Sequence, residues 1–278
     1  MARLRPAFSR SILKRQLKFS LPLVPALFAF WFIDSSDRYL LKIFLPLSEV
    51  GLYNVGYNIG LVMMIVVGGF TLAWPPYYHK NNQDNEGQTI CNDVLKIYLL
   101  ITSFFVVVLS LAAPVVVKIL TTERFYQAFT IVPWVAMAYL LKGPYIIFLM
   151  GVYIKNRTSW QLYLEGFAAA VNIGLNILLI PIVGREAAAI TTLLSYTILV
   201  VGAYLMVMRV NPIPKISWGY VLGIMVLTLV ISGSAAWAGN IKGYILFSIA
   251  LFFCYSSILL FIGYREIIPM IRKEVRYV

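Results

Sequence analysis

The sequence predicts an all-α membrane protein, a polytopic bundle of about eight transmembrane helices, and three observations lead to this fold class. Composition is the first: 61% of the 278 residues are hydrophobic and only 12% are charged, roughly half the charge density of soluble domains. The second is a succession of apolar runs, each about as long as the 20 residues that a helix needs to cross the hydrocarbon layer. The third is the uneven distribution of lysine and arginine among the connectors.

Eight apolar runs are expected to form the spans. They cover residues 19–44, 52–74, 94–117, 129–153, 160–183, 187–208, 218–238 and 243–263. Helices are expected because a chain in lipid must satisfy its own backbone hydrogen bonds, and these runs are too long and too uniformly apolar to be strands of a barrel. The segments between them contain the helix breakers proline, glycine and asparagine.

The cations indicate the orientation. With the N-terminus in the cytoplasm, eight crossings place most of the basic residues inside: Arg3, Arg5, Arg10, Lys14, Arg15, Lys18, Lys80, Lys155, Arg157, Arg209, Lys215, Arg265, Arg272, Lys273 and Arg276. The outside connectors keep Lys118, Arg124, Arg185 and Lys242. This asymmetry follows the positive-inside rule and predicts that both termini are cytoplasmic. It also accounts for the net charge of +12 without a nucleic-acid partner, because basic residues at the foot of membrane helices typically contact anionic lipids.

Several kinds of enzyme chemistry have little support. The chain has one histidine, His79, and two cysteines, Cys91 and Cys254, which are expected at different membrane depths and not in a disulfide. This is too few for a metal site or for a Ser/His or Cys/His nucleophile. We therefore expect no catalytic residues, metal or cofactor.

Polar residues at membrane depth are the candidates for function, because a charge near the bilayer centre is costly unless it faces a cavity or a partner. In the first span Asp34, Asp37, Arg38 and Lys42 recur at spacings of three and four, which places them on one helix face. One interpretation is a cavity lining in which Arg38 holds an anionic head group while a carboxylate responds to ions. The alternative is an internally neutralised cluster that fixes helix packing.

Lys142 is the second unusual charge, near the middle of its span and followed by Gly143 and Pro144. A Gly-Pro pair can kink a membrane helix and free backbone groups, which is tolerated only against protein or water. Because a lysine at mid-span is too far from the interface to snorkel, a water-filled cavity is favoured over a structural pair with a carboxylate.

Other polar residues at membrane depth form similar patterns. In the fifth span Gln161, Glu165, Asn172 and Asn176 occupy one helical stripe that should face the bundle interior. The two asparagines either join helices by hydrogen bonds or line the cavity, and Glu165 either couples ions or pairs with Lys155 or Arg157. The second span repeats the pattern, for packing or for lining, with these residues: Tyr53, Asn54, Tyr57, Asn58, Gly56 and Gly60.

Five segments resemble a known family. SSDRYLL (35–41), EVGLYNVGY (49–57) and LAWPP (72–76) resemble the start of the second half of polysaccharide-unit flippases. NIGLNILLIP (172–181) and the alanine-rich AAAITT (187–192) resemble the asparagine-rich helix of that family and the helix after it. The resemblance covers residues 17–210, and the last two spans match only in being hydrophobic.

The resemblance implies membership of the superfamily that joins multidrug and toxin extruders, lipid II flippases and polysaccharide-unit flippases. Complete members have two six-helix lobes around a central cavity, and the flippases add two helices. The chain then divides into a cytoplasmic basic segment (1–18), a six-helix membrane lobe (19–210), two additional transmembrane helices (211–265) and a cytoplasmic basic tail (266–278). The first lobe is expected to be missing, either because the chain is a fragment or because a split partner supplies it.

The function implied is the flipping of polyprenyl-diphosphate-linked oligosaccharide units across the bacterial inner membrane, for export of O-antigen, capsule or exopolysaccharide. Arg38 and Lys142 would hold the diphosphate, with Asn54, Asn58, Asn172 and Asn176 lining the cavity, and Asp34, Asp37 or Glu165 would couple transport to an ion. Membrane lipids, a first lobe and a glycan polymerase are the implied partners.

Four alternatives remain open. A drug extruder would favour an acidic cavity for its cations, and a lipid II flippase shares the superfamily. A glycan polymerase or acyltransferase would need a larger external loop or a catalytic arrangement. A non-transporting partner in glycan assembly is the fourth.

Overall fold

The computed structural model describes residues 9–81, 87–213, 216–239 and 243–266. All regular secondary structure in these residues is helical, which confirms the all-α class. The helices are α1 (Arg10–Ser20), α2 (Leu23–Phe44), α3 (Leu47–Gly60), α4 (Met63–Asn81), α5 (Gly87–Leu120), the 3-10 helix η2 (Glu123–Thr130), α6 (Val132–Ile154), α7 (Thr158–Val183), α8 (Arg185–Val210), α9 (Trp218–Ala238) and α10 (Tyr244–Glu266). Lys215, Lys242 and the predicted basic stretches over 1–8 and 267–278 lie outside the described residues.

The span count agrees with the prediction of about eight. Seven helical stretches of the described chain are long and apolar enough to cross a membrane, and the bent pair of α3 and α4 makes eight if it counts as one span. The chain is therefore a multi-pass helical membrane protein.

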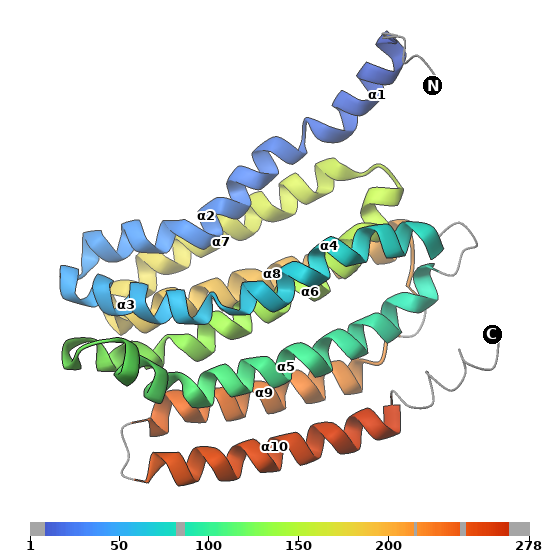
Figure 1. The fold of residues 1–278 in the computed structure, drawn as a ribbon. Helices are drawn as coiled ribbons and strands as arrows, with labels where there is room; N and C mark the ends of the chain where they lie inside the picture. The colour runs from blue at the N-terminus through green and yellow to red at the C-terminus, as the bar shows by residue number, and fades with distance from the viewer. Residues whose placement is uncertain (1–8, 82–86, 214–215, 240–242, 267–278) are drawn as a thin grey trace, which may run out of the picture.

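The helices run along one common direction and are joined at two opposite ends (Figure 1). The start of α1, the ends of α4, α6, α8 and α10 and the starts of α5, α7 and α9 lie at one end. The ends of α2, α5, α7 and α9 and the starts of α3, α6, α8 and α10 lie at the other. This alternation groups the connectors as the distribution of cations predicted.

Helix α6 is the centre of the bundle. In its most apolar window 89% of the residues are buried, compared with 11% for α10 at the edge. Helices α4, α5, α8 and α9 pack against α6, α7 packs on α8, and α2 packs along α7 (Figure 1). Side chains of α6 are therefore held in position from several directions, whereas those of α10 largely face the surroundings.

The second span differs from its prediction as one helix over 52–74. It is broken at Leu61 and Val62, where α3 and α4 meet with a bend of 46°. Gly60 packs so closely on α6 that an added Cβ would lie 2.7 Å from the Cβ of Val135. Glycine is a common site of kinks in membrane helices, and here the break lets both halves of the span approach the bundle.

The Gly-Pro pair of α6 does not end the helix, because α6 continues through Pro144. Proline has no N–H, so the carbonyl of Leu140, one turn earlier, loses its helical partner. The hydroxyl of Tyr98 on α5 donates to that carbonyl at 3.0 Å. The ring of Tyr98 can reach it because it occupies the space beside Gly143 that a side chain would fill. Protein, not water, thus satisfies the freed backbone group.

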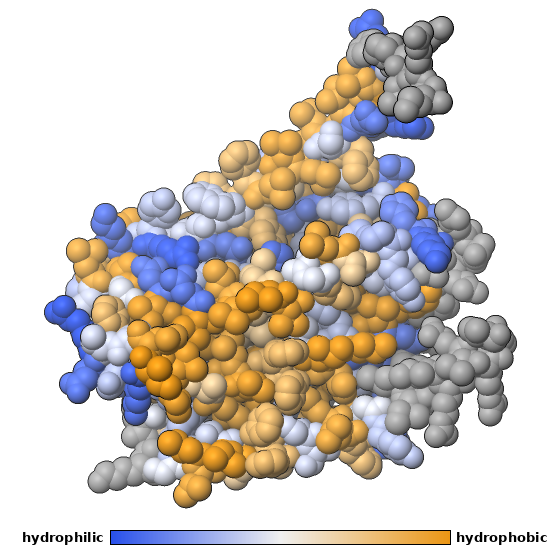
Figure 2. Space-filling view, viewed as in Figure 1, coloured by the Kyte–Doolittle hydropathy of each residue, from blue (hydrophilic) through white to orange (hydrophobic). Residues whose placement is uncertain are grey.

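Apolar side chains cover most of the middle of the visible face in Figure 2, and hydrophilic residues gather at its left and right ends. A surface of this kind suits a bilayer, in which the hydrocarbon layer surrounds the middle of the bundle and the head groups surround its ends.

Candidate functional site

A set of hydrogen-bonded polar side chains lies between α2, α3, α6 and α8. We name it the tyrosine–carboxylate cluster, and it consists of Asp34, Asp37, Arg38, Tyr53, Asn54, Tyr57, Tyr139 and Tyr196. The tyrosine rings continue the packing of the bundle while their hydroxyls contact the carboxylates and the arginine, so the cluster is both polar and embedded in the apolar core.

Asp37 is the most deeply placed member, with no exposed surface. One of its carboxylate oxygens accepts a hydrogen bond from the hydroxyl of Tyr53 on α3. The other accepts from the backbone N–H of Arg38 at 2.8 Å. A buried carboxylate requires such partners, because taking an unpaired charge out of water costs several kcal/mol.

Arg38 is only partly buried and faces α3. Its Nε donates to the Oδ1 of Asn54 at 3.0 Å, and its guanidinium carbon lies 4.5 Å from the centre of the Tyr57 ring. These contacts fix one side of the guanidinium by a hydrogen bond and one face by a cation–π interaction. Arg38 forms no salt bridge within the described chain, although the charges of Asp37 and Asp34 act on it.

Asp34 lies one turn before Asp37 and connects α2 to the centre of the bundle. Its Oδ1 accepts from the hydroxyl of Tyr196 on α8 at 2.9 Å. The hydroxyls of Tyr57 and Tyr139 share a hydrogen bond of 2.6 Å, and Tyr57 also donates to the backbone carbonyl of Asp34 at 3.2 Å. These hydrogen bonds therefore connect α6 to α3, α3 to α2 and α2 to α8.

Lys142 on α6 is partly exposed and projects beside the cluster. Its Nζ lies 4.8 Å from the centre of the Phe30 ring on α2 and 3.9 Å from the Sδ of Met64 on α4. Asp34 and Glu165 are the carboxylates whose charges act on it, yet it forms no salt bridge with either of them. The alternative interpretation, a structural ion pair between Lys142 and a carboxylate, is therefore not what the structure shows.

Glu165 on α7 is buried, and its hydrogen-bond partners are not the basic residues named in the sequence analysis. Its Oε1 accepts from the hydroxyl of Tyr145 at 2.5 Å and from the amide of Gln161 at 2.8 Å. Lys155 and Arg157 are exposed at the end of the bundle, so the predicted alternative of pairing with them is wrong. The second oxygen, Oε2, is buried without a partner among the described residues.

Asn172 and Asn176 are both completely buried, as the helical stripe predicted. The Oδ1 of Asn172 accepts from the hydroxyl of Ser36 on α2 and from the amide of Asn176, each at 3.1 Å. The Oδ1 of Asn176 accepts from Thr191 on α8 at 2.6 Å. These bonds join α2, α7 and α8, so the main role of the two asparagines is to hold these helices together. The Nδ2 of Asn172 remains buried without a partner within the described chain.

The bond between Asn176 and Thr191 gives a test of this packing role. A double-mutant cycle with Asn176→Leu and Thr191→Val is expected to give a coupling free energy of about 0.6 to 1.7 kcal/mol, the range of hydrogen bonds between membrane helices. The free energies of unfolding are measured by titration with denaturing detergent. A cycle with the exposed neighbour Ile177 in place of Asn176 should give no coupling, and additive effects for Asn176 and Thr191 would contradict the packing role.

Two of the predicted polar residues are placed away from these contacts. Asn58, predicted to bind substrate, is exposed on α3 and takes no part in the hydrogen bonds of the described cluster. Lys42 is exposed near the end of α2. Both lie one turn beyond a cluster member, so sharing a helix face was not enough to bring them into the cluster.

Three tyrosines of the site were missed by sequence reasoning, namely Tyr139, Tyr145 and Tyr196. A signal was present for two of them, because Tyr139 and Tyr145 lie three residues before and after Lys142 and so share its helix face. Tyr196 carries no such signal, since only the packing of α8 against α2 and α6 brings it to Asp34.

The fold and the site together define a multi-pass helical membrane protein with a polar, cation-bearing cluster inside its bundle. Over residues 1–130 the chain is similar to a family described as polysaccharide biosynthesis protein. The matched region holds Asp34, Asp37, Arg38 and Asn54 and ends before Lys142. No curated protein and no solved structure matches the chain. The family match supports a role in polysaccharide synthesis or export.

Proposed function

We propose that this protein flips polyprenyl-diphosphate-linked oligosaccharide units across the bacterial cytoplasmic membrane, with both termini in the cytoplasm, and that it is a transporter and not an enzyme. The family match supports the connection with polysaccharides. The grouping of connectors at two ends supports the topology. In this proposal a separate six-helix first lobe completes the cavity.

The proposal rests on the surroundings of two charged side chains, Arg38 and Lys142. Both are cations in membrane-spanning helices, both are partly exposed, and neither forms a salt bridge in the described structure. A cation at this depth is costly unless it faces water or meets an anion. A diphosphate offers several oxygens to both residues, and the free N–H groups of a guanidinium match phosphate geometry.

The surroundings of the two cations suit intermittent binding. Arg38 is held by Asn54 and Tyr57, whereas Lys142 rests against Phe30 and Met64, which are weak partners. Weakly satisfied cations can accept an anionic head group without first breaking a strong ion pair. The lipid tail would remain in the bilayer while the head group moves past the cluster.

Ion coupling is assigned to Asp34, Asp37 and Glu165. Each carboxylate is held by a tyrosine hydroxyl from another helix, namely Tyr196, Tyr53 and Tyr145. A relative movement of α2, α3, α6 or α8 would change these bonds and thereby the affinity for a proton or sodium ion. Such a difference in affinity between two conformations is what couples an ion gradient to transport.

A transport assay in proteoliposomes tests the proposal. The lipid-linked oligosaccharide is incorporated, and the fraction cleaved by a glycosidase added outside reports flipping. Arg38→Gln and Lys142→Gln are each expected to lower the flipping rate at least about tenfold, since a hydrogen bond to a charged group contributes about 1.5 to 3 kcal/mol. Lys42→Gln is the matched control, because it removes an exposed charge one turn from Arg38 and should leave the rate unchanged.

The assay is run with the chain alone and together with a separate six-span first lobe. Flipping in either preparation that falls in the two cluster variants supports the proposal. Flipping that persists at the full rate in both variants would remove these cations from the mechanism. Absence of flipping in both preparations of well-folded protein would favour the non-transporting partner in glycan assembly.

A further inference from the structure

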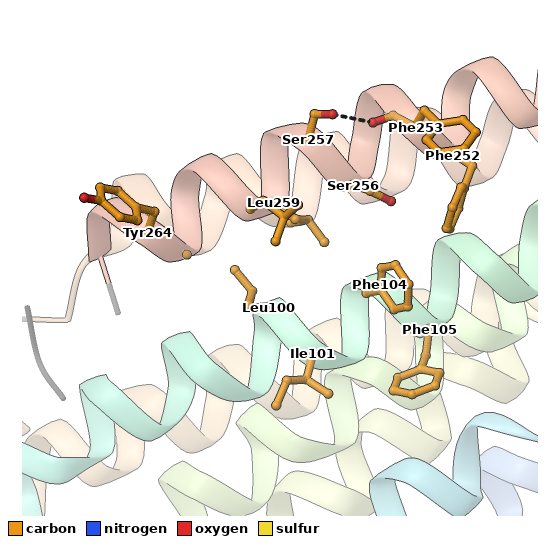
Figure 3. Close-up of a pocket in the computed structure, with 12 residues that line it drawn as sticks. Leu100, Ile101, Phe104, Phe105, Phe252, Phe253, Ser256, Ser257, Leu259 and Tyr264 are labelled. Atoms are coloured by element: carbon orange, nitrogen blue, oxygen red, sulfur yellow. Dashed lines mark hydrogen bonds between the residues drawn. The ribbon is translucent and has the colours of Figure 1, made fainter. Parts of the chain in front are cut away.

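An apolar groove lies between α5 and α10, at the edge of the bundle (Figure 3). It has a volume of about 840 Å³, which is within the range of ligand sites, about 300 to 1,000 Å³. Phe104 and Phe105 line it from α5, and Phe252, Phe253, Ser256 and Tyr264 line it from α10. Only the serines and the tyrosine add polar atoms to a wall that is otherwise aliphatic and aromatic.

The groove exists because α10 is attached to the bundle at separate points. The hydroxyl of Tyr244 donates to the carbonyl of Leu111 at 3.0 Å, and the hydroxyls of Tyr255 and Thr228 lie 3.0 Å apart. At the other end of α10 Glu266 forms a salt bridge of 2.7 Å with Lys96. Between these attachments α10 and α5 border the groove, where the rings of Phe104 and Phe252 lie 5.9 Å apart between centres. The Oγ of Ser256 is buried there without a partner in the described chain.

A hydrocarbon chain is the occupant that suits this space. Protein interiors are close-packed, and an unfilled apolar wall loses the dispersion contacts of its side chains. Both α5 and α10 are long and apolar enough to span a membrane, so the molecules that surround the groove are lipids. A lipid tail laid along it would fill the gap that the protein leaves.

One end of the groove is suited to an anionic head group. Tyr264 is 67% exposed at that end, and the exposed Arg265 follows it. This is also the end of the bundle that carries the larger share of the cations. Lys96 is already paired with Glu266, which leaves Arg265 as the described cation at this place that forms no salt bridge. Basic sites between helices at the cytoplasmic side characteristically bind anionic lipid head groups.

We propose that the groove between α5 and α10 binds one anionic phospholipid, whose acyl chain lies against Phe104, Phe252 and Ser256 and whose phosphate contacts Arg265. The site is distinct from the tyrosine–carboxylate cluster, because α2 and α3 lie on the opposite side of the bundle from α10 (Figure 1). A cargo whose head group sits at Arg38 could not place its tail in this groove directly. The bound lipid would fasten α10 to α5.

The test measures which lipid stays with the protein after its extraction from vesicles that contain phosphatidylcholine and phosphatidylglycerol. Native mass spectrometry of the purified protein is expected to show phosphatidylglycerol enriched about fivefold over the vesicle composition, the effect of one arginine near an anionic head group. Ser256→Trp, which fills the groove, and Arg265→Gln, which leaves its volume intact, should each abolish the enrichment.

Leu246→Trp is the matched control, because Leu246 is 76% exposed on the same helix and does not line the groove. It should keep the full enrichment. Equal retention of both lipids by the unaltered protein, or the same enrichment in Ser256→Trp, Arg265→Gln and Leu246→Trp, would overturn the proposal. Displacement of phosphatidylglycerol by added polyprenyl phosphate would also overturn it, because the occupant would then be an isoprenoid lipid. If Ser256→Trp does not fold, the enrichment measured for Arg265→Gln alone tests the proposal.

Discussion

Asp37→Leu is expected to lower the free energy of unfolding by about 1 to 3 kcal/mol, the cost of leaving a buried hydrogen-bond donor without its partner. Leucine has a similar size but no acceptor, so the hydroxyl of Tyr53 would lose its partner inside the bundle. The charge of Arg38 would also lose the carboxylate nearest to it in sequence. The midpoint of thermal unfolding in detergent, read from the fraction that remains monodisperse, measures the effect.

Asp37→Asn separates the hydrogen bond from the charge. The amide oxygen can still accept from Tyr53, so most of the stability should return, while any coupling of transport to an ion through Asp37 is lost. A loss of stability in Asp37→Asn as large as in Asp37→Leu would show that the negative charge, and not the hydrogen bond, stabilises the cluster. Full stability in Asp37→Leu would contradict the structural role given to this residue.

Gly56→Ala is expected to destabilise the protein by about 1 to 3 kcal/mol, as overpacking of a well-packed core does. A Cβ on Gly56 would lie against the backbone oxygen of Ala128 and 2.7 Å from the Cβ of Ile131. Neither atom is the end of a flexible side chain, so α3 would have to move away from η2 and the start of α6. Because Asn54 and Tyr57 are on α3, the movement should also disturb the contacts of Arg38.

Gly68→Ala is the matched control on the other half of the same broken span. Nothing lies within 4 Å of the added Cβ at Gly68, so the alanine should stabilise α4 by up to about 1 kcal/mol through its higher helix propensity. Unfolding midpoints of the two variants are therefore expected to shift in opposite directions. A shift of the same sign and size in both would show that close packing at Gly56 does not limit stability.

Much of the fold could be predicted because hydropathy records where the chain meets lipid. The apolar runs correspond to α2, the α3 and α4 pair, and α5 to α10, and the cations separate the connectors into two groups. The break at Leu61 and Val62 could not be predicted from hydropathy, since both halves are equally apolar. It depends on the close approach of Gly60 to Val135, a contact between distant segments.

The candidate site was predictable only in part. The charges at membrane depth were found because they are conspicuous in apolar sequence, and the stripe of Asn172 and Asn176 was found from helical periodicity. Their partners Tyr145 and Tyr196 were not found, because these tyrosines are compatible with ordinary core packing. Asn58 was assigned to the site by its position on a helix, whereas its side chain is exposed.

The sequence by itself determined that this protein is a multi-span helical bundle with charged residues inside the membrane, because the cost of exposing backbone and charge to hydrocarbon depends mainly on local composition. The tertiary structure alone decided that Tyr98 satisfies the carbonyl freed by Pro144 and that Arg38 binds Asn54. It also decided that α10 stands apart from α5 along a groove. These outcomes depend on which helix faces come together, and that choice is made by packing between segments far apart in the chain.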